Sequence, residues 1–459
     1  MGLLAKGALG AVLLTSAYLY FKISKVPPVP HLEDTWWGPG KPTKEDIAVK
    51  PFKINVPIEV IKDLRHRLEI SPPFQTPLEG ANQNYGINAK LLQTVVDYWK
   101  SKYDWPKREE FLNQYPQYQT KIQGLNIHFI HVKPRNAKGL KVLPMLMVHG
   151  WPGSIREFYE IIPLLTEPQP GRNYVFELVI PSLPGYGFSD GAARPGLATA
   201  QMAHIFKRLM ERLNFDKYYL QGGDWGSLVT QNLAALYPDN VIGVHGNTCF
   251  VNSPRYHFIL ALGSYFPSLV FENEAEKFKN SPYSKTIRFM IEESGYLHIQ
   301  ATKPDTVGVG LRESPAGLAA YILEKFITWT NPTWKNLPDG GLTRKFTLDQ
   351  LLDNVMIYWV TKSITTSARL YAENFASNNT ALQIDEIPIK VPTGCARFAY
   401  ELLYPPRKAM GGRFPNLVHL TDYEDGGHFA AFEIPSILAE DIYQFVDKVE
   451  RLKIGKQEL

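Results

Sequence analysis

Apolar side chains in the first quarter of the chain recur with the period of an α-helix. Residues 57–70 place Ile58, Ile61 and Leu64 on one face, and residues 88–101 repeat the pattern. Spacings of three and four residues bring side chains to one side of a helix, where they can pack against a core. This part of the chain is therefore predicted to be mainly helical.

Further along, short apolar runs typical of buried strands alternate with stretches of helical period. Continuous apolar runs suit the strands of a parallel sheet, which are covered on both faces. The alternation of strands and helices predicts a parallel sheet wrapped by helices. The predicted strands are residues 127–132, 142–148, 176–180, 217–221, 241–246, 389–398 and 416–421, and the main predicted helices are 199–213, 227–236 and 435–452.

A long helical stretch interrupts the predicted sheet. Residues from about 250 to 370 are mostly of helical pattern, with prolines and many aromatic side chains. A sheet split by a helical insertion is typical of an enzyme core that carries a cap. We divide the chain into a membrane anchor (1–25), an N-terminal wrapping region (26–119), a first part of the core (120–249), a helical cap (250–370) and a second part of the core (371–459).

The N-terminal segment has the composition of a membrane-spanning helix. Residues 2–23 are almost wholly apolar, and Lys6 and Lys22 stand near the two ends. About 20 apolar residues span the hydrocarbon core of a bilayer, and terminal lysines can extend to its interfaces. A cleaved signal peptide is the alternative, but no clear small-residue cleavage site follows. We expect an uncleaved single-pass anchor, with Lys22, Lys25 and the catalytic body on the cytosolic side.

Charge and cysteine content exclude several classes of function. The formal net charge of +4 over 459 residues does not favour nucleic acid as a partner. Two cysteines, Cys249 and Cys395, are too few for a disulfide framework or a multi-thiolate zinc site. We expect both to be buried free thiols in a reducing compartment, in keeping with a cytosolic body.

The residues with chemical meaning begin at a sharp turn between a predicted strand and a predicted helix. Gly222-Gly223-Asp224-Trp225-Gly226 has the G-x-S-x-G form of a nucleophile elbow, with aspartate in place of serine. A serine that attacked an alkyl carbon would leave an ether, whereas aspartate leaves an ester whose carbonyl water can attack. Asp224 is therefore the predicted nucleophile for displacement at a saturated carbon, followed by hydrolysis. A helix-capping aspartate is the simpler alternative.

Two further residues complete the chain order of α/β-hydrolases, which is nucleophile, acid and base. His428 stands after the last predicted strand and before the closing helix, where the base belongs. Glu401 follows the preceding strand and is the first candidate for the acid, which would fix the imidazole tautomer. Asp422 and Asp425 are rivals, since they lie closer to His428 in sequence.

The hydrolytic step also needs two backbone N–H donors that bind its oxyanion. One is expected at Trp225, the residue after the nucleophile. The other is expected at Trp151, in the loop His149-Gly150-Trp151-Pro152-Gly153. The same loop also reads as a tight turn, and the two uses are compatible.

Together these motifs resemble the microsomal epoxide hydrolases, a branch of the α/β-hydrolase superfamily, over nearly the whole chain. Within that family the chain looks most like the insect juvenile hormone epoxide hydrolases. The matching segments include Trp36-Trp37-Gly38-Pro39-Gly40, the His-Gly-Trp-Pro loop, the Gly-Gly-Asp-Trp-Gly elbow, Ser294-Gly295-Tyr296, Arg369-Leu370-Tyr371 and Gly427-His428-Phe429.

The resemblance implies an α/β-hydrolase fold with a helical cap domain, an N-terminal wrapping region and an N-terminal membrane anchor. It implies that Tyr296 and Tyr371 in the cap bind and protonate the epoxide oxygen, as the opening of an epoxide to an alkoxide requires. It assigns the acid to Glu401 rather than Asp422. It also implies a protein of the endoplasmic reticulum (microsomal) membrane that needs no metal or organic cofactor.

The expected reaction is hydrolysis of a lipophilic epoxide, with juvenile hormone as the candidate substrate, to a vicinal diol through an ester on Asp224. A haloalkane dehalogenase would share this nucleophile and its base, but the paired cap tyrosines and the anchor argue against it. A lipophile-binding protein on the same fold is the non-enzymatic alternative. It predicts a broken catalytic position, and the motifs of this chain are intact.

Overall fold

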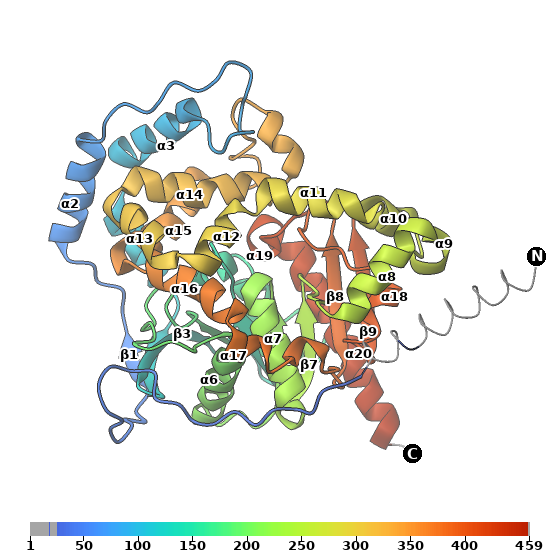
Figure 1. Cartoon of the computed structure of the whole chain (residues 1–459). Helices are drawn as coiled ribbons and strands as arrows, with labels where there is room; N and C mark the ends of the chain where they lie inside the picture. Colours follow the sequence, from blue (N-terminus) through green and yellow to red (C-terminus); the bar gives the residue numbers. More distant parts are fainter. Residues whose placement is uncertain (1–17, 19–24, 458–459) are drawn as a thin grey trace, which may run out of the picture.

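A nine-stranded sheet in the order β1-β2-β3-β5-β4-β6-β7-β8-β9 lies at the centre of the computed structural model (Figure 1), which describes residue 18 and residues 25–457. The strands are β1 (Lys50–Phe52), β2 (Gln117–Ile122), β3 (Leu125–Val132), β4 (Lys141–Val148), β5 (Tyr174–Pro181), β6 (Tyr218–Gly222), β7 (Val241–Gly246), β8 (Thr393–Phe398) and β9 (Leu417–Tyr423). Each strand predicted from the sequence has its counterpart within a few residues.

Helices surround this sheet, and those predicted from periodicity are present. The α-helices are α2 (Ile58–Glu69), α3 (Ala89–Ser101), α4 (Trp105–Leu112), α5 (Ile162–Thr166), α6 (Thr199–Arg212), α7 (Asp224–Leu236), α8 (Pro254–Tyr265), α9 (Pro267–Val270), α10 (Glu274–Asn280), α11 (Tyr283–Glu293), α12 (Gly295–Thr302), α13 (Pro304–Glu313), α14 (Pro315–Thr328), α15 (Leu348–Thr361), α16 (Ile364–Phe375), α17 (Ser377–Thr380), α18 (Arg407–Met410), α19 (Ala430–Glu433) and α20 (Pro435–Gln457). Short 3-10 helices are η1 (Ile155–Phe158), η2 (Pro238–Asn240), η3 (Pro332–Asn336) and η4 (Ile384–Glu386).

The sheet is mixed rather than wholly parallel. Strands β4 to β9 pair in parallel, as the apolar runs predicted, whereas β1, β2 and β3 add an antiparallel edge. Gln123 and Gly124 join β2 to β3 with φ values of 51° and 84°. Two successive residues of positive φ form the tight hairpin turn that matches the twist of antiparallel strands. Sequence alternation alone did not reveal this edge.

The parallel strands are covered on both faces. On β7, a Cβ at Gly243 would meet Phe445 of α20, and a Cβ at Gly246 would meet Ser227 of α7. Residues three apart on a strand point to opposite faces, so α7 and α20 lie on opposite sides of the sheet. The predicted catalytic residues follow the carboxyl ends of these strands, and the core beneath them is packed from both sides.

The helical insertion follows β7 and returns to the sheet at β8. Helices α8 to α16 form most of the upper part of the molecule in Figure 1. The N-terminal helices α2 and α3 pack against α14 of this insertion. The boundary that we placed at residue 370 falls within α16, and the sheet resumes only at Thr393.

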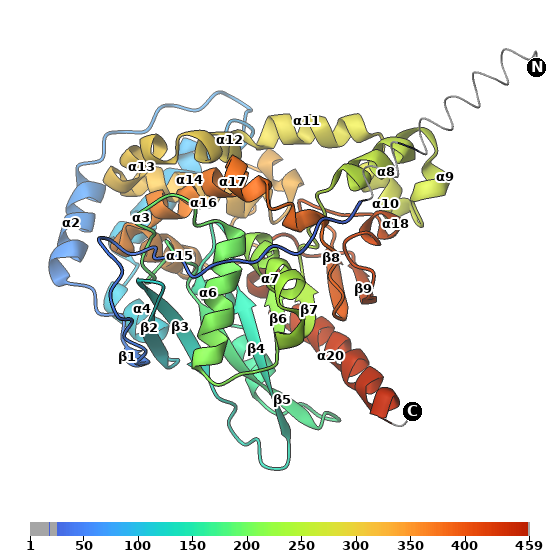
Figure 2. The ribbon, with the colours of Figure 1, turned by 60° about the horizontal axis from the view of Figure 1, so that its bottom comes forward.

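Residues before β1 form an extended arm on the body. In Figure 2 the arm crosses α6, and Asp34 contacts His204 and Arg208 of that helix at 2.8 and 2.5 Å. The indole of Trp37 is buried and donates to the side chain of Gln123 at 2.9 Å. The predicted membrane anchor lies outside the described residues except for Tyr18 and Lys25. None of the helices described within residues 25–457 has the length and apolar character needed to cross a bilayer.

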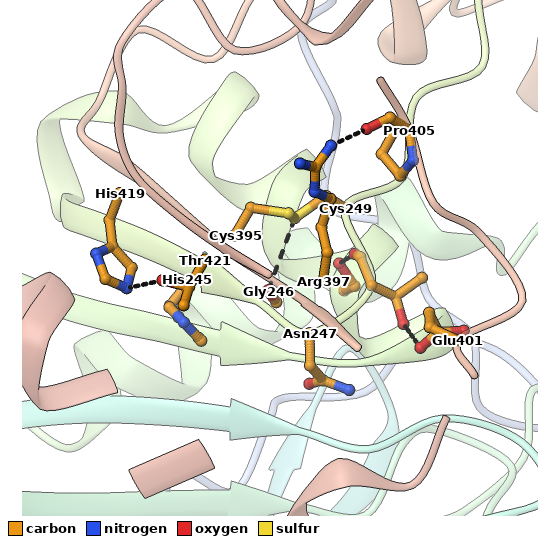
Figure 3. The surroundings of a disulfide bond; sticks show 12 residues. His245, Gly246, Asn247, Cys249, Cys395, Arg397, Glu401, Pro405, His419 and Thr421 are labelled. Atoms are coloured by element: carbon orange, nitrogen blue, oxygen red, sulfur yellow. Dashed lines mark hydrogen bonds between the residues drawn. A yellow bond between two sulfur atoms is a disulfide. The ribbon is translucent and has the colours of Figure 1, made fainter. Parts of the chain in front are cut away.

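The two cysteines form a disulfide, which corrects the expectation of free thiols. Cys249 lies three residues beyond β7 and Cys395 lies in β8, which pairs with β7 so that Gly246 faces Cys395. Their Cα atoms are 6.0 Å apart, a separation suited to a disulfide. Figure 3 shows the bond beside Gly246 and near Glu401. The 146-residue separation in sequence conceals this proximity, because only the fold makes β7 and β8 neighbours.

The double substitution Cys249→Ser/Cys395→Ser should lower the free energy of unfolding by about 2–4 kcal/mol, because the cross-link restricts the unfolded chain. Urea unfolding in oxidising buffer measures the difference. Reductant should bring the wild-type protein to the stability of the double variant and leave the variant unchanged. Equal stability of the two proteins without reductant would contradict the cross-link.

Candidate active site

Asp224 stands at the turn between β6 and α7 with a backbone φ of 50°. This left-handed conformation is uncommon for a residue with a side chain, and it exposes the carboxylate above the sheet. Glycines make the turn possible. A Cβ at Gly226 would lie 1.9 Å from the carbonyl oxygen of Val148, and one at Gly222 would lie 2.6 Å from the backbone of Gly226.

His428 lies in the loop between β9 and α19, with its imidazole between two carboxylates. Its Nε2 is 3.2 Å from Oδ2 of Asp224, and its Nδ1 is 2.7 Å from Oε1 of Glu401. The backbone N–H of His428 donates to the carbonyl of Trp329 at 3.0 Å. Glu433 accepts from the backbone N–H groups on either side of His428, at 2.8 and 2.9 Å. These bonds fix the loop and therefore the direction of the imidazole.

Glu401 is held in place by hydrogen bonds from its surroundings. The hydroxyl of Thr248 donates to its Oε2 at 2.8 Å, and the backbone N–H of Leu402 donates to its Oε1 at 2.7 Å. The Thr248 oxygen also accepts from the backbone N–H of Asp224 at 3.2 Å. Thr248 thus connects the nucleophile to the acid.

The two rival acids have other partners. Asp422 accepts from the guanidinium of Arg397 at 2.6 and 2.9 Å, and from the hydroxyl of Tyr404 at 2.8 Å. Asp425 pairs with Lys345 at 2.6 Å. Nδ1 of His428 is instead bound to Glu401.

The charges around His428 oppose the effect of its burial. Burial by itself lowers the pKa of an imidazole, but the carboxylates of Glu401 and Asp224 together raise the pKa of His428 well above its ordinary value. The two ionised neighbours therefore favour the protonated form of the imidazole.

The loop after β4 brings a backbone donor to the nucleophile. The N–H of Trp151 donates to Oδ1 of Asp224 at 2.8 Å. Gly150 permits this approach, because a Cβ there would lie 2.3 Å from the Asp224 side chain. Trp225 lies in the first turn of α7, where backbone N–H groups have no partner within the helix. The Trp151 amide therefore contacts the Asp224 carboxylate, and the role of the Trp225 amide stays a prediction.

The two cap tyrosines meet above this carboxylate. Tyr296 lies on α12 and Tyr371 on α16, with ring centroids 5.9 Å apart. Tyr296 stacks on Trp151 at 5.3 Å, and Tyr371 packs edge-on against Trp225 at 4.7 Å. Burial, followed by the charge of Asp224, raises the pKa of Tyr296. Burial, followed by Tyr296 and Asp224, raises the pKa of Tyr371 well above its ordinary value.

All five predicted side chains line one cavity of about 190 Å³ between the core and the cap. They are Asp224, His428, Glu401, Tyr296 and Tyr371. The remaining wall is mainly apolar, with Phe289, Leu297 and Leu228 among its residues. Such a chamber suits a lipophilic molecule with one reactive polar group.

Three residues that hold the site carried no signal that we recognised in the sequence. They are Thr248, which bridges Asp224 and Glu401, Trp329, which accepts from the His428 backbone, and Glu433. A glutamate five residues after the base is a local clue that could have been used. In the part of the chain that the structure describes, no three His, Cys, Asp or Glu side chains are grouped to hold a metal ion.

Comparison with known proteins places the chain in a family. A family model described as epoxide hydrolase N terminus matches residues 49–158, and one described as alpha/beta hydrolase fold matches residues 144–378. Juvenile hormone epoxide hydrolase 1 of Ctenocephalides felis is 50% identical over 459 residues, covering 100% of this chain and 98% of that protein. Epoxide hydrolase 1 of Sus scrofa is 46% identical over 429 residues, covering 92% and 94%.

Solved structures agree with this placement. The crystal structure of juvenile hormone epoxide hydrolase from the silkworm Bombyx mori has a TM-score of 0.90 at 49% identity, covering 92% of this chain and 99% of that one. The Aspergillus niger epoxide hydrolase has a TM-score of 0.72 at 31% identity, covering 88% and 97%. Likeness of this extent, in sequence and in fold, confirms that the chain belongs to the epoxide hydrolases of the α/β-hydrolase fold.

Proposed function

We propose that this epoxide hydrolase converts lipophilic epoxides to vicinal diols through a covalent ester on Asp224. The observation that carries the proposal is the convergence of Asp224, His428 and two cap tyrosines on one apolar cavity. A carboxylate nucleophile, a base and two phenol donors are the groups that this two-step reaction needs.

In the first step, Asp224 attacks an epoxide carbon from the side opposite the C–O bond that breaks. Its Oδ1 accepts from the Trp151 amide, so Oδ2 is the attacking atom and Oδ1 becomes the ester carbonyl. Tyr296 and Tyr371 bind the epoxide oxygen, and one of them gives its proton to the alkoxide. Their raised pKa values, caused first by burial, keep both hydroxyls protonated at neutral pH.

In the second step, His428 takes a proton from a water molecule whose oxygen attacks Cγ of Asp224. The oxyanion on Oδ1 is stabilised by the amides of Trp151 and Trp225. Collapse of this intermediate breaks the bond between Cγ and Oδ2, so Oδ2 leaves as one hydroxyl oxygen of the diol. One proton of the water goes to this hydroxyl by way of His428, and the other restores the tyrosine hydroxyl. The water oxygen remains on Asp224.

Ester formation itself prepares the base for this step. The carboxylates of Glu401 and Asp224 oppose the effect of burial and raise the pKa of His428. The ester removes the charge of Asp224, so the pKa of His428 falls and the imidazole can become neutral. Glu401 then holds the tautomer and stabilises the imidazolium that forms when water is deprotonated.

We further propose juvenile hormone, a sesquiterpenoid ester epoxide, as the substrate. The apolar wall of the cavity and the identity to juvenile hormone epoxide hydrolases of Ctenocephalides felis and Bombyx mori support this choice. Such a substrate partitions into membranes, which agrees with an anchor at residues 2–23.

We also propose that this segment anchors the enzyme in the endoplasmic reticulum membrane as a single span. Its apolar length supports the proposal. The cytosolic placement of the body stays a prediction, and the Cys249–Cys395 disulfide counts against it, because disulfides persist mainly in oxidising compartments.

One observation favours dehalogenation as a second candidate activity. The indole N–H groups of Trp151 and Trp225 are buried without a hydrogen-bond acceptor among the described residues. Paired N–H donors beside an aspartate nucleophile could bind a halide. The two cap tyrosines have no role in that reaction, so epoxide hydrolysis stays the first proposal, and chloride release from chloroalkanes by the pure protein tests the second.

Replacing Glu401 by glutamine should lower kcat at least about 100-fold, because the imidazole loses its anionic partner. Steady-state diol formation measures the effect. Asp425→Asn is the matched control, since Asp425 pairs with Lys345 away from His428, and it should keep wild-type kcat. Full activity of Glu401→Gln would mean that Asp422 or Asp425 is the acid instead.

Removing either cap hydroxyl should slow the alkylation step. Tyr296→Phe and Tyr371→Phe should each reduce kcat/KM by about 10- to 100-fold, because the alkoxide loses one donor. The double variant should form no detectable ester. Single-turnover measurement of ester formation tests this, and unchanged alkylation in both single variants would exclude the tyrosines as proton donors.

His428→Gln should form the ester but fail to hydrolyse it. Peptide mass spectrometry after incubation with a sesquiterpenoid methyl ester epoxide should then find the added mass on the peptide that contains Asp224. Absence of this adduct, under conditions where wild-type enzyme makes diol, would mean that water attacks the epoxide directly.

A further inference from the structure

A second, smaller cavity shares Asp224 and His428 with the substrate chamber but faces the loop after β4 instead of the cap. Its volume is about 10 Å³, which is about the space that one water molecule needs. Glu157, Asn247 and Trp151 are among its other lining residues. The substrate chamber, by contrast, has none of these three residues in its wall.

Glu157 enters this cavity from η1. A Cβ added to Gly153 would lie 1.3 Å from Oε1 of Glu157, so the carboxyl occupies the space that the absent side chain leaves. Its carboxyl has a backbone hydrogen bond from Ser154, and a carboxyl bound by one donor keeps further acceptor sites. Burial raises the pKa of Glu157 to about 8; the charge of His428 opposes this rise, and the charges of Asp224 and Glu433 add to it. A second donor can therefore bind to the Glu157 carboxyl where it lines the small cavity.

The other polar groups nearby already have partners. Both oxygens of Glu433 accept backbone N–H groups beside His428. The amide oxygen of Asn247 accepts from Gln221 at 2.9 Å. Glu433 and Asn247 are therefore occupied, whereas Glu157 lines the cavity and keeps acceptor sites.

We propose that Glu157 binds the hydrolytic water in this small cavity and orients it for deprotonation by His428. The proposal rests on the two-step mechanism above. A water molecule has two O–H bonds, and only one can point at Nε2 of His428. The carboxyl oxygen of Glu157 accepts the other, which leaves a water lone pair free to attack Cγ of the Asp224 ester. The proton goes to His428, the bond between Cγ and Oδ2 breaks so that Oδ2 leaves with the diol, and Glu157 itself is unchanged.

This role concerns the second chemical step alone. Glu157 is absent from the wall of the substrate chamber, so its loss leaves epoxide binding and alkylation intact. Because either ionisation state of a carboxyl retains an oxygen that accepts a hydrogen bond, a glutamine at this position also supplies an acceptor. Leucine is similar in size and supplies none.

The test is a single-turnover experiment with full-length wild-type enzyme, Glu157→Leu and Glu157→Gln and a sesquiterpenoid methyl ester epoxide. Quenched samples are analysed for the Asp224 ester by peptide mass spectrometry and for diol by chromatography. Glu157→Leu should form ester within about threefold of the wild-type rate and hydrolyse it at least about tenfold more slowly, so ester accumulates. Glu157→Gln should restore most of the hydrolysis rate.

The matched control is Glu160→Gln, three residues along the chain, where the carboxylate instead pairs with Arg156 at 2.8 Å. Both of its steps should match the wild type. Hydrolysis by Glu157→Leu within threefold of wild type would overturn the proposal, as would equal slowing of both steps, which indicates a structural role. A glutamine variant as slow as the leucine variant would rule out the acceptor role. If wild-type enzyme forms neither ester nor diol, the proposed function itself has failed.

Discussion

The left-handed turn at Asp224 is the constraint on which the rest of the site depends. It exists because Gly222 and Gly226 have no Cβ, so β6 and α7 can meet where any side chain would strike backbone. The turn also places the carboxylate at the start of α7, where free N–H groups and the helix dipole favour negative charge. The position of the nucleophile is thus set by the backbone and does not depend on contacts with the other catalytic side chains. The base, the acid and the cap are then positioned relative to this one fixed carboxylate.

Those partners come from the ends of neighbouring parallel strands. Asp224 follows β6, Thr248 follows β7, Glu401 follows β8 and His428 follows β9, and these four strands lie side by side in the sheet. Parallel strands end at a common edge, where α/β proteins bind their ligands. Thr248 contacts both Asp224 and Glu401 and so couples adjacent strand ends. The cap adds only the two phenols, so nucleophile, base and acid belong to the core and the electrophilic donors to the insertion.

Local sequence predicted the parts of the fold that local physics controls. The elbow, the parallel strands and α20 were evident because glycine spacing and apolar period are short-range signals. Tyr296 and Tyr371 were different, since no periodicity separates them from the other 22 tyrosines, and only family resemblance identified them. Asp422 lies six residues from His428 and yet binds Arg397, because β9 directs it away from the imidazole. The disulfide and Glu157 escaped notice for the same reason, since both depend on segments that meet only in the folded chain.

The position of the disulfide gives the polypeptide an unusual covalent topology. Cys249 and Cys395 stand just before and just after the helical insertion, so the whole cap forms a closed ring attached to the core at one point. A single cut by a protease within the cap opens that ring without separating the two halves of the sheet. The substrate chamber, which needs residues from both sides of the ring, would then remain assembled in one covalent molecule for as long as the bond is oxidised.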